Sequence, residues 1–401
     1  MPSEIVEKPY ILENRVQYYA WGMSGKNAFI PKLLDIEIEN KKSYAEIWIG
    51  GHPKAPSKIV FNHEKMDLNQ VINKYPDKIL GPAVKEKFAG QLPFLLKVLS
   101  AGEALSIQTH PDKATAQQLH AADPEHYPDA NHKPEIAIAI DYLKALIGFR
   151  PLHEINAFLE DYTEILELIG VEHIDSLNDD DDLKNIFSEM MKRSQQYPEI
   201  LATTCQNFAK KIRNKHQISE RDQLFLQLYP KYGNDVGLMV LYFLNLVNIS
   251  SGEGVYLDAG VPHAYLQGNI VECMANSDNV VRAGLTPKYK DVQTLIDITD
   301  YKSGKPEIQR PNQNSDNLTK YNVPSPEFEI SRYILPGTNV LDLQDKDKVE
   351  IYLALEGEVI IQDQNNTMPV KQGQSVLIPA CLSDYKIVAE RDSILFRVSV
   401  P

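Results

Sequence analysis

The nine residues from Leu105 to Lys113, LSIQTHPDK, alternate apolar and polar side chains until the chain meets a proline. Alternation with a period of two is typical of a β-strand, and it places Gln108 and His110 on the same face. Pro111 and Asp112 end this strand, because proline offers no N–H to a neighbouring strand. An amide and an imidazole at a strand end can bind a metal, and they also suit a polar edge strand. The stretch therefore predicts a strand and leaves both interpretations open.

Length and composition are those of an ordinary soluble globular protein with two or three domains. The chain has 401 residues, of which 43% are hydrophobic and 24% are charged. Its formal net charge of −14 argues against nucleic-acid and membrane partners, because both attract basic surfaces. Cys205, Cys273 and Cys381 show no CxxC spacing, and the first residues, MPSEIVEKPY, contain no apolar signal segment. We therefore expect a cytoplasmic protein in a reducing compartment.

Hydrophobic spacing divides the chain into β-rich and helical parts. Short apolar runs broken by Gly, Pro and Asn predict strands over most of residues 10–100, 251–292 and 325–401. Between residues 152 and 232, apolar residues recur at intervals of three and four, which predicts a helical insertion. The acidic run Asp179 to Asp182 suits a helix start, and Gly170 suits a helix end. The expected helices are 68–75, 82–88, 114–122, 155–169, 183–193, 199–215, 219–228 and 238–247.

Two β segments share a pattern of glycine, apolar strand and turn. GEGVYLDAGVPHAY, from Gly252, aligns without gaps on GQSVLIPACLSDYK, from Gly373, and His263 then falls on Asp384. This rhythm is typical of jelly-roll barrels of the cupin type. We therefore expect a mainly β protein, with two cupin-type jelly-roll β-barrels plus an all-α domain, and no metal in the second barrel. The expected domains are a first cupin domain in two parts, 1–150 and 237–310, a helical domain, 151–236, and a C-terminal cupin-like barrel, 311–401.

Four residues that can bind a metal occur near expected strand ends, namely Gln108, His110, Glu135 and His263. Gly260 and Pro262 predict a tight turn that presents His263. An amide, two imidazoles and a carboxylate suit a divalent ion of the zinc class that acts as a Lewis acid. A structural zinc site would more often use cysteine thiolates, and the cysteines here lack suitable spacing. Seven other histidines are expected to be structural, namely His52, His63, His120, His126, His153, His173 and His216.

Charged residues also gather in the segment ECMANSDNVVRAGLTPKYK, residues 272–290. Its charges suit a solvated loop. In an acidic protein, Arg282 and Lys288 also suit an anion such as a phosphate, the arginine by its bidentate fork and the lysine as a point charge. Glu272, beside a metal and an arginine, is a candidate proton carrier.

A single charge, Lys97, interrupts the apolar run from Phe94 to Leu99. Burying a charge is costly unless it is paired or reaches a cavity. We expect an edge position from which the amine reaches solvent, with a cavity-facing lysine as the alternative.

Seven segments between Asn14 and Val292 carry a resemblance to a known family. They read, in order, NRVQYYAWG, AEIWIGGHPKAPS, LPFLLKVLS, LSIQTHPDK, NHKPEIAIA, GVPHAYLQG and ECMANSDNVVRAGLTPKYKDV. These blocks resemble those of type I mannose-6-phosphate isomerases, also named phosphomannose isomerases, and several are long and specific. The expected helical insertion and C-terminal barrel also lie where that family has them. One departure is Gly51, where another small residue is common.

The resemblance implies a zinc enzyme that acts on a small sugar phosphate, interconverting mannose 6-phosphate and fructose 6-phosphate, and we expect a monomer. By matching position, it implies that zinc is bound by Gln108, His110, Glu135 and His263. It implies that Arg282 is the active-site arginine. The other positions implied by the match are Trp21, Glu46, Lys97, Tyr265, Asp278 and Lys288, expected to bind substrate, with Glu272 and Lys133 expected to be catalytic.

Aldose and ketose interconvert when a proton leaves C2, an enediolate forms and a proton returns at C1. Glu272 and Lys133 are the candidates for the proton carrier, with Glu272 first, while His132 and Lys97 are candidates for assisting ring opening. Two other classes stay open, an iron-dependent cupin dioxygenase and a sugar-binding cupin without catalysis. Gln108 as a fourth ligand weighs against the dioxygenase, and the many charged residues weigh against a passive binding protein.

Overall fold

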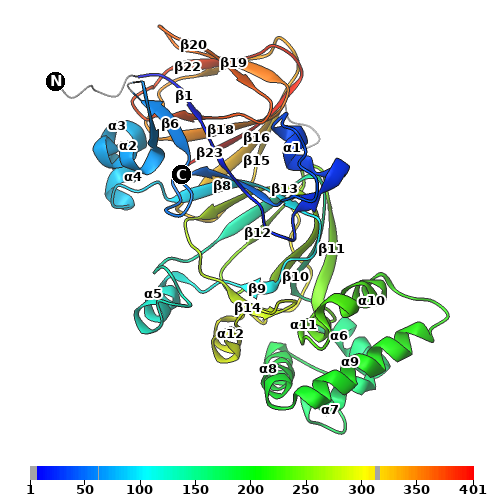
Figure 1. The fold of residues 1–401 in the computed structure, drawn as a ribbon. Coiled ribbons are helices and arrows are strands. Elements are labelled where there is room, and N and C mark those ends of the chain that lie inside the picture. The colour runs from blue at the N-terminus through cyan, green and yellow to red at the C-terminus, as the bar shows by residue number, and fades with distance from the viewer. Residues whose placement is uncertain (1–6, 62, 312–316) are drawn as a thin grey trace.

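The computed structural model describes residues 7–61, 63–311 and 317–401. Two β units lie one above the other in Figure 1, and the helices from α6 to α11 form a separate group at one end. The chain is thus mostly β-sheet with a helical part, as the sequence predicts. Within the described ranges, no helix is both long enough and apolar enough to cross a lipid bilayer. The expected boundary at residue 311 adjoins residues 312–316, which lie outside the described residues.

The first β unit is a nine-stranded antiparallel sheet. Its main path runs β11-β10-β13-β8-β5-β2, while β12 pairs with β10, and β9 pairs with β13 and β14. The bounds are β2 Arg15–Gln17, β5 Glu46–Gly50, β8 Phe94–Ala101, β9 Ile107–Thr109, β10 Glu135–Phe149, β11 Leu244–Ser250, β12 Gly254–Leu257, β13 His263–Ala275 and β14 Val281–Gly284. Two separate two-stranded sheets pair β3 Met23–Ser24 with β4 Ser43–Tyr44, and β6 Lys58–Phe61 with β7 Glu64–Asp67.

The second β unit has a six-stranded sheet, β1-β21-β18-β23-β16-β15, and a four-stranded sheet, β17-β22-β19-β20. Apolar side chains of the two sheets pack into one core, and a further core joins the six-stranded sheet to the first unit. The bounds are β1 Tyr10–Leu12, β15 Leu318–Lys320, β16 Glu329–Leu335, β17 Val340–Leu343, β18 Glu350–Glu356, β19 Glu358–Gln362, β20 Thr367–Lys371, β21 Ser375–Ile378, β22 Tyr385–Ala389 and β23 Ser393–Ser399.

Most helices occur where the sequence predicts them. Asp179 caps the start of α8 by accepting the Asp182 N–H at 2.9 Å. Gly170 ends α7 with a left-handed backbone at φ 88°. The helix expected over 155–169 is broken after Asp161. The bounds are η1 Gly25–Asn27, α1 Phe29–Leu33, α2 Leu68–Lys74, α3 Pro76–Leu80, α4 Pro82–Lys87, α5 Lys113–Ala122, α6 Leu152–Asp161, η2 Thr163–Ile165, α7 Leu166–Ile169, α8 Asp180–Gln196, α9 Pro198–Arg213, α10 Glu220–Tyr232, α11 Gly237–Val240 and α12 Val292–Ile298.

The prediction of a helix over residues 238–247 is wrong for the second half of that range. Helix α11 ends at Val240, and strand β11 begins at Leu244 and pairs with β10 from Tyr142 to Phe149. A short apolar run without polar positions has no period that separates a buried helix from a buried strand. The open edge of β10 decides the outcome, because it offers backbone partners to this segment.

The two β units repeat one strand order. The path β12-β10-β13-β8-β5 of the first unit matches β21-β18-β23-β16-β15 of the second, and β9-β13-β10-β11 matches β17-β22-β19-β20. Gly252 and Gly373, which the sequence alignment superposes, both have left-handed backbones at φ 79° and 80°. The same alignment superposes Leu257 on Ile378, whose strand partners are Glu135 and Glu350. Glu350 is therefore the counterpart of Glu135 in the second unit.

Glu350 is buried and forms an ion pair with Arg397, whose Nε donates to Glu350 Oε1 at 2.6 Å. The Tyr385 hydroxyl donates to the other carboxylate oxygen. Replacing Arg397 with methionine leaves a buried carboxylate without its cation, which costs about 3–5 kcal/mol in comparable ion pairs. We expect the urea midpoint of Arg397→Met to fall markedly, and the double variant with Glu350→Gln to recover much of the loss. The exposed Arg391→Met is the control, and a wild-type midpoint in Arg397→Met would contradict the pairing.

Candidate metal centre

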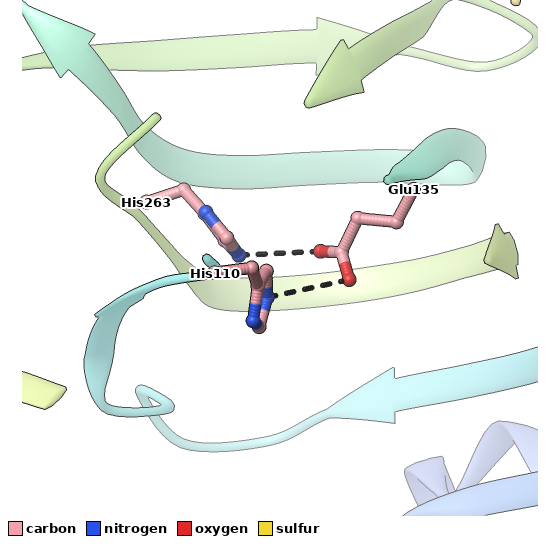
Figure 2. Close-up of side chains that lie close together, drawn as sticks. All are labelled: His110, Glu135 and His263. Carbon is pink, nitrogen blue, oxygen red and sulfur yellow. Dashed lines mark ion pairs between the residues drawn. The ribbon is translucent and has the colours of Figure 1, made fainter. Parts of the chain in front are cut away.

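His110, Glu135 and His263 bring their polar atoms together at the ends of three strands (Figure 2). His110 directly follows β9, Glu135 begins β10 and His263 begins β13. His110 Nε2 lies 3.6 Å from Glu135 Oε2, and His263 Nε2 lies 3.2 Å from Glu135 Oε1. In the described part of the chain, no other set of His, Cys, Asp or Glu meets the spacing of a metal site.

The spacing of these atoms fits a tetrahedral ion. Zinc binds imidazole nitrogen and carboxylate oxygen at about 2.0–2.2 Å, which places two tetrahedral ligand atoms about 3.4 Å apart. The two measured separations lie on either side of that value. His110 Nε2 and Glu135 Oε2 are also buried without a hydrogen-bond partner among the described residues. Such polar atoms are costly to bury alone, so the donor set suits a divalent cation.

Backbone carbonyl groups fix the orientation of both imidazoles. His110 Nδ1 lies 2.7 Å from the carbonyl oxygen of Asn279, and His263 Nδ1 lies 2.9 Å from that of Val261. Each Nδ1–H donates to its carbonyl, which leaves Nε2 as the free lone pair of a neutral ring. Both rings therefore present the nitrogen that a metal requires.

Gln108 lies where a fourth ligand is expected. Its side-chain nitrogen is 3.5 Å from His263 Nε2. Rotating the side-chain amide by about 180° exchanges its nitrogen and oxygen, so that the oxygen faces the ligand set. In the sheet, Gln108 pairs with His263 on one side and with Arg282 on the other. The predicted arginine thus stands next to the ligand set, half-buried, with no ion-pair partner among the described residues. Burial lowers the pKa of its guanidinium.

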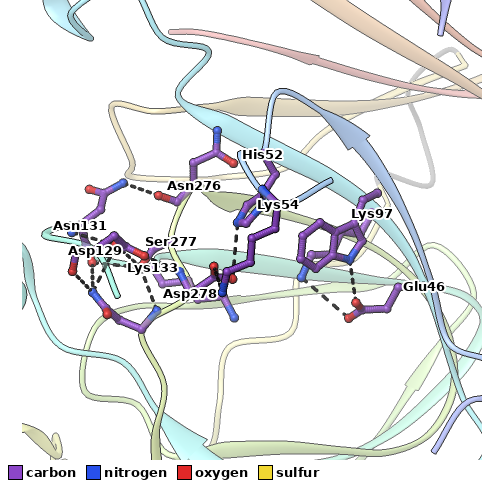
Figure 3. Close-up of polar contacts among 12 residues, drawn as sticks. Glu46, His52, Lys54, Lys97, Asp129, Asn131, Lys133, Asn276, Ser277 and Asp278 are labelled. Carbon is purple, nitrogen blue, oxygen red and sulfur yellow. Dashed lines mark hydrogen bonds and ion pairs between the residues drawn. The ribbon is translucent and has the colours of Figure 1, made fainter. Parts of the chain in front are cut away.

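A row of charges crosses the same sheet beside the triad. Lys97 Nζ, on β8, lies 3.8 Å from Glu46 Oε1 (Figure 3). It also lies 3.2 Å from Glu272 Oε2, and Trp48 Nε1 donates to Glu46 Oε2 at 2.7 Å. The lysine is buried, so the solvent-reaching edge position expected from the sequence is wrong. Burial would lower the pKa of Lys97, but Glu46 and Glu272 outweigh it and raise the pKa. Lys97 is therefore a fixed cation.

Glu272 and Glu135 differ in acidity although both are buried. Burial raises the pKa of Glu272 above its ordinary value, against the opposing effect of Lys97. Burial acts likewise on Glu135, but Lys133 and the two histidines hold the pKa of Glu135 well below its usual range. Lys133 Nζ lies 3.4 Å from Glu135 Oε2. One carboxylate is thus suited to carry a proton and the other to remain an anionic ligand.

Tyr265 connects these groups. Its hydroxyl donates to Glu135 Oε1 at 2.9 Å from a buried position on β13. Burial, together with the nearby charges of Glu135 and Glu272, raises the pKa of Tyr265 well above its ordinary value. The phenol therefore stays protonated and acts as a hydrogen-bond donor.

Asp278 lies at the edge of this region and is held by two basic side chains. Its carboxylate lies 2.7 Å from Lys54 Nζ and 3.4 Å from His52 Nε2 (Figure 3). Burial would raise the pKa of Asp278, but both partners outweigh it and hold the pKa well below its ordinary value. His52 was expected to be structural, but it contacts Asp278, a predicted site residue. The sequence HPK within GGHPKAPS, which places His52 two residues from Lys54, could have indicated this contact.

A polar network ties the loop before β10 to the loop after β13 (Figure 3). Asp129 accepts the Ser277 hydroxyl at 2.8 Å and the Asp278 N–H at 2.7 Å. Asn131 donates to the carbonyl oxygen of Asn276 at 2.8 Å. Because the second loop also carries the Asn279 carbonyl that orients His110, this network helps to fix the metal centre. The sequence analysis missed it, although the polar residues of PDAN and ANSDN were visible.

Three predicted residues lie apart from the charged row. His132 points its Nε2 at Glu327, Lys288 is exposed on the loop after β14, and Trp21 stacks on Tyr19 with ring centroids 5.7 Å apart. Burial raises the pKa of Tyr19, and the nearby carboxylates of Glu46 and Asp278 raise it further, so the aromatic pair borders the same region. A cleft of about 910 Å³ adjoins it, lined among others by His52, Lys54, Asp129, Asp278 and Glu327.

Comparison with known proteins places this chain in a family. The family model described as phosphomannose isomerase type I, catalytic domain, matches residues 10–152. Mannose-6-phosphate isomerase of Rattus norvegicus is 39% identical, over 96% of this chain and 94% of its own length. The chain belongs to the mannose-6-phosphate isomerase family. The Homo sapiens member is also 39% identical, over 95% of this chain and 96% of its own length.

Solved structures of mannose-6-phosphate isomerases share the whole fold. A mannose 6-phosphate isomerase bound with zinc and yttrium matches with a TM-score of 0.86 and 31% identity, over 98% of this chain and 99% of its own. The Salmonella typhimurium enzyme bound to fructose 6-phosphate and zinc matches with a TM-score of 0.84 at the same identity and coverage. The likeness therefore covers the helical part and both β units.

Proposed function

We propose that this protein is a zinc-dependent isomerase that interconverts mannose 6-phosphate and fructose 6-phosphate. The observation that carries the proposal is the buried His110, Glu135 and His263 triad, with two polar atoms left unpartnered, beside a carboxylate of raised pKa. Family membership supplies the substrate, since relatives of similar length carry that name.

Zinc would be bound by Gln108, His110, Glu135 and His263. When bound, it supplies a Lewis acid that polarises sugar oxygens and stabilises negative charge. The pKa of Glu135, held well below its usual range, keeps that carboxylate ionised, and burial lowers the pKa of His110, which keeps that ring neutral. These are the protonation states that metal binding requires.

Proton transfer is assigned to Glu272. Its carboxylate takes the proton from C2, the C–H electron pair forms the C1–C2 double bond, and the π pair of the C1 carbonyl moves onto O1 to give the enediolate. The same carboxyl then returns a proton to C1, while the hydroxyl proton of O2 passes to O1 and the C2 carbonyl forms. The raised pKa of Glu272 lies closer to neutral pH than that of an ordinary carboxyl group. This suits a group that must both accept the proton from C2 and donate one to C1. Lys97, 3.2 Å away, stabilises the carboxylate form, and Arg282 stabilises the enediolate. Lys133 is the second candidate carrier, and ring opening is assigned to His132 or Lys97.

Substrate binding is assigned to the residues around the charged row. The exposed Lys288 suits the phosphate dianion, which the net charge of −14 would otherwise repel. The remaining substrate-binding assignments are Trp21, Glu46, Tyr265 and Asp278.

The finer architecture belongs to the same proposal. The repeated strand order supports two cupin-type jelly-roll units, one formed by 1–150 and 237–310 and one by 311–401, with 151–236 as the helical domain. Arg397 beside Glu350, the counterpart of Glu135, supports a second unit that binds no metal. A cytoplasmic monomer remains our expectation, based on composition and the three free cysteines.

A coupled assay of the zinc-loaded protein on mannose 6-phosphate tests the function. We expect fructose 6-phosphate to form, and the rate to fall to background after treatment with a chelator and to return with added zinc. An iron-dependent dioxygenase would instead consume oxygen in the same vessel. Oxygen uptake without isomerisation would overturn the proposal in favour of that class.

A further inference from the structure

Glu327 belongs to the second β unit in sequence but contacts the loop before the metal centre. It lies two residues before β16 and is buried. Its Oε1 is 2.7 Å from His132 Nε2, and its Oε2 accepts the Ser325 hydroxyl at 2.6 Å. Both carboxylate oxygens are therefore engaged, and the hydroxyl of Ser325 fixes the rotamer that faces His132.

His132 occupies a loop whose position depends on side-chain bonds. Residues 128–134 lie outside any strand or helix. On one side of His132, Asn131 is fixed by Asn276, and on the other, Lys133 lies 3.4 Å from Glu135. The bond to Glu327 is the contact that fixes the residue between them.

We propose that Glu327 is a positioning residue, which anchors His132 and thereby holds Lys133 against Glu135 at the metal centre. The inference rests on the proposed function, because it assigns Glu327 a part in the same reaction. It also means that the second β unit supplies a side chain on which the first unit's active site depends.

The chemistry of the pair supports an anchor. Burial would raise the pKa of Glu327, but His132 and Ser325 outweigh it and hold the pKa below its ordinary value. An ionised carboxylate that accepts an N–H is a stronger partner than a neutral acceptor. The bond fixes the proton of His132 on Nε2 when the ring is neutral, leaving Nδ1 as the acceptor on the loop side.

Two substitutions separate the anchor from general packing. Glu327→Leu removes the acceptor, whereas Glu327→Gln keeps the shape and a neutral acceptor. We expect kcat of Glu327→Leu to fall about 10–100-fold, the range found for residues that orient metal ligands, with KM changed less. Glu327→Gln should recover part of that loss. Thermal unfolding of each variant verifies that the fold is intact.

Double variants test whether Glu327 acts through its proposed partners. If it acts through His132 and Lys133, adding Glu327→Leu to His132→Gln or to Lys133→Ala should lower kcat no further. The control is Lys87→Ala, which removes a 3.3 Å bond to the Pro326 carbonyl oxygen in the same segment and leaves His132 untouched. We expect near wild-type kcat for this control. Full additivity with both partners would overturn the proposal.

An NMR signal tests the contact between Glu327 and His132 without relying on the isomerase reaction. The Nε2–H proton of His132, bonded to a carboxylate, should give a downfield-shifted NMR signal that disappears in Glu327→Leu and persists in Lys87→Ala. If the wild-type protein fails to isomerise mannose 6-phosphate, the proposed function fails, and this signal still tests the contact. Wild-type kcat in Glu327→Leu, or an unchanged His132 signal, would overturn the inference.

Discussion

His263→Ala is expected to lose bound zinc and, with it, isomerase activity down to the background of the assay. His263 supplies one of three buried ligand atoms, and its Nε2 is the one nearest to Glu135, at 3.2 Å. Without it, one imidazole, the Glu135 carboxylate and the Gln108 amide remain, and this smaller donor set binds zinc less tightly. Elemental analysis of the dialysed variant should therefore show less than one zinc per chain.

The matched control for this variant is His173→Ala. His173 lies on the surface of the helical part, 83% exposed, near Asp175. We expect its zinc content and kcat to equal those of the wild type. Zinc retained by His263→Ala at wild-type affinity would show that the triad is not the metal site.

Arg282→Ala is expected to keep its zinc and to lose most of its kcat. The guanidinium stands next to Gln108 in the sheet and has no ion-pair partner among the described residues, so it is available to the reacting sugar. Removing a group that stabilises charge in a transition state costs about 10²–10³-fold in kcat. Steady-state kinetics with zinc analysis of the same preparation measures both quantities.

A lysine at position 282 refines this test, because it keeps the charge without the planar fork. We expect Arg282→Lys to recover only part of the lost kcat. Arg310→Ala, at an exposed arginine 80% open to solvent, is the control for general charge loss. Loss of zinc from Arg282→Ala would mean that the arginine helps to bind the metal, contrary to its assigned role.

The metal centre could be predicted from the sequence because its ligands sit at strand ends. Alternation in LSIQTHPDK places Gln108 and His110 on one face, and the structure brings them to His263 and Glu135. Residue type at expected strand ends also singled out Glu135 and His263, and the resemblance implied that all four bind one ion, since nothing in the spacing links residues 110 and 263. The repeat of glycine, strand and turn was also visible, and it predicted equivalent strands in the two β units.

Other features depend on contacts that local sequence does not encode. Lys97 was expected at a solvent-facing edge, because a charge in an apolar run gives no sign that Glu46 and Glu272 lie beside it. Residues 244–247 were expected in a helix, and only the edge of β10 makes them a strand. The contact between His132 and Glu327 joins positions 195 residues apart, so no local sequence pattern predicts it.

The central claim is that one zinc ion, held by the His110, Glu135 and His263 triad with Gln108, makes this protein an isomerase. Titration of the metal-free protein with zinc tests it most directly, with the mannose 6-phosphate isomerisation rate measured at each addition. We predict that the rate rises linearly and stops rising at one zinc per chain. Full activity in the metal-free protein, or a rate that does not respond to zinc, would contradict the account.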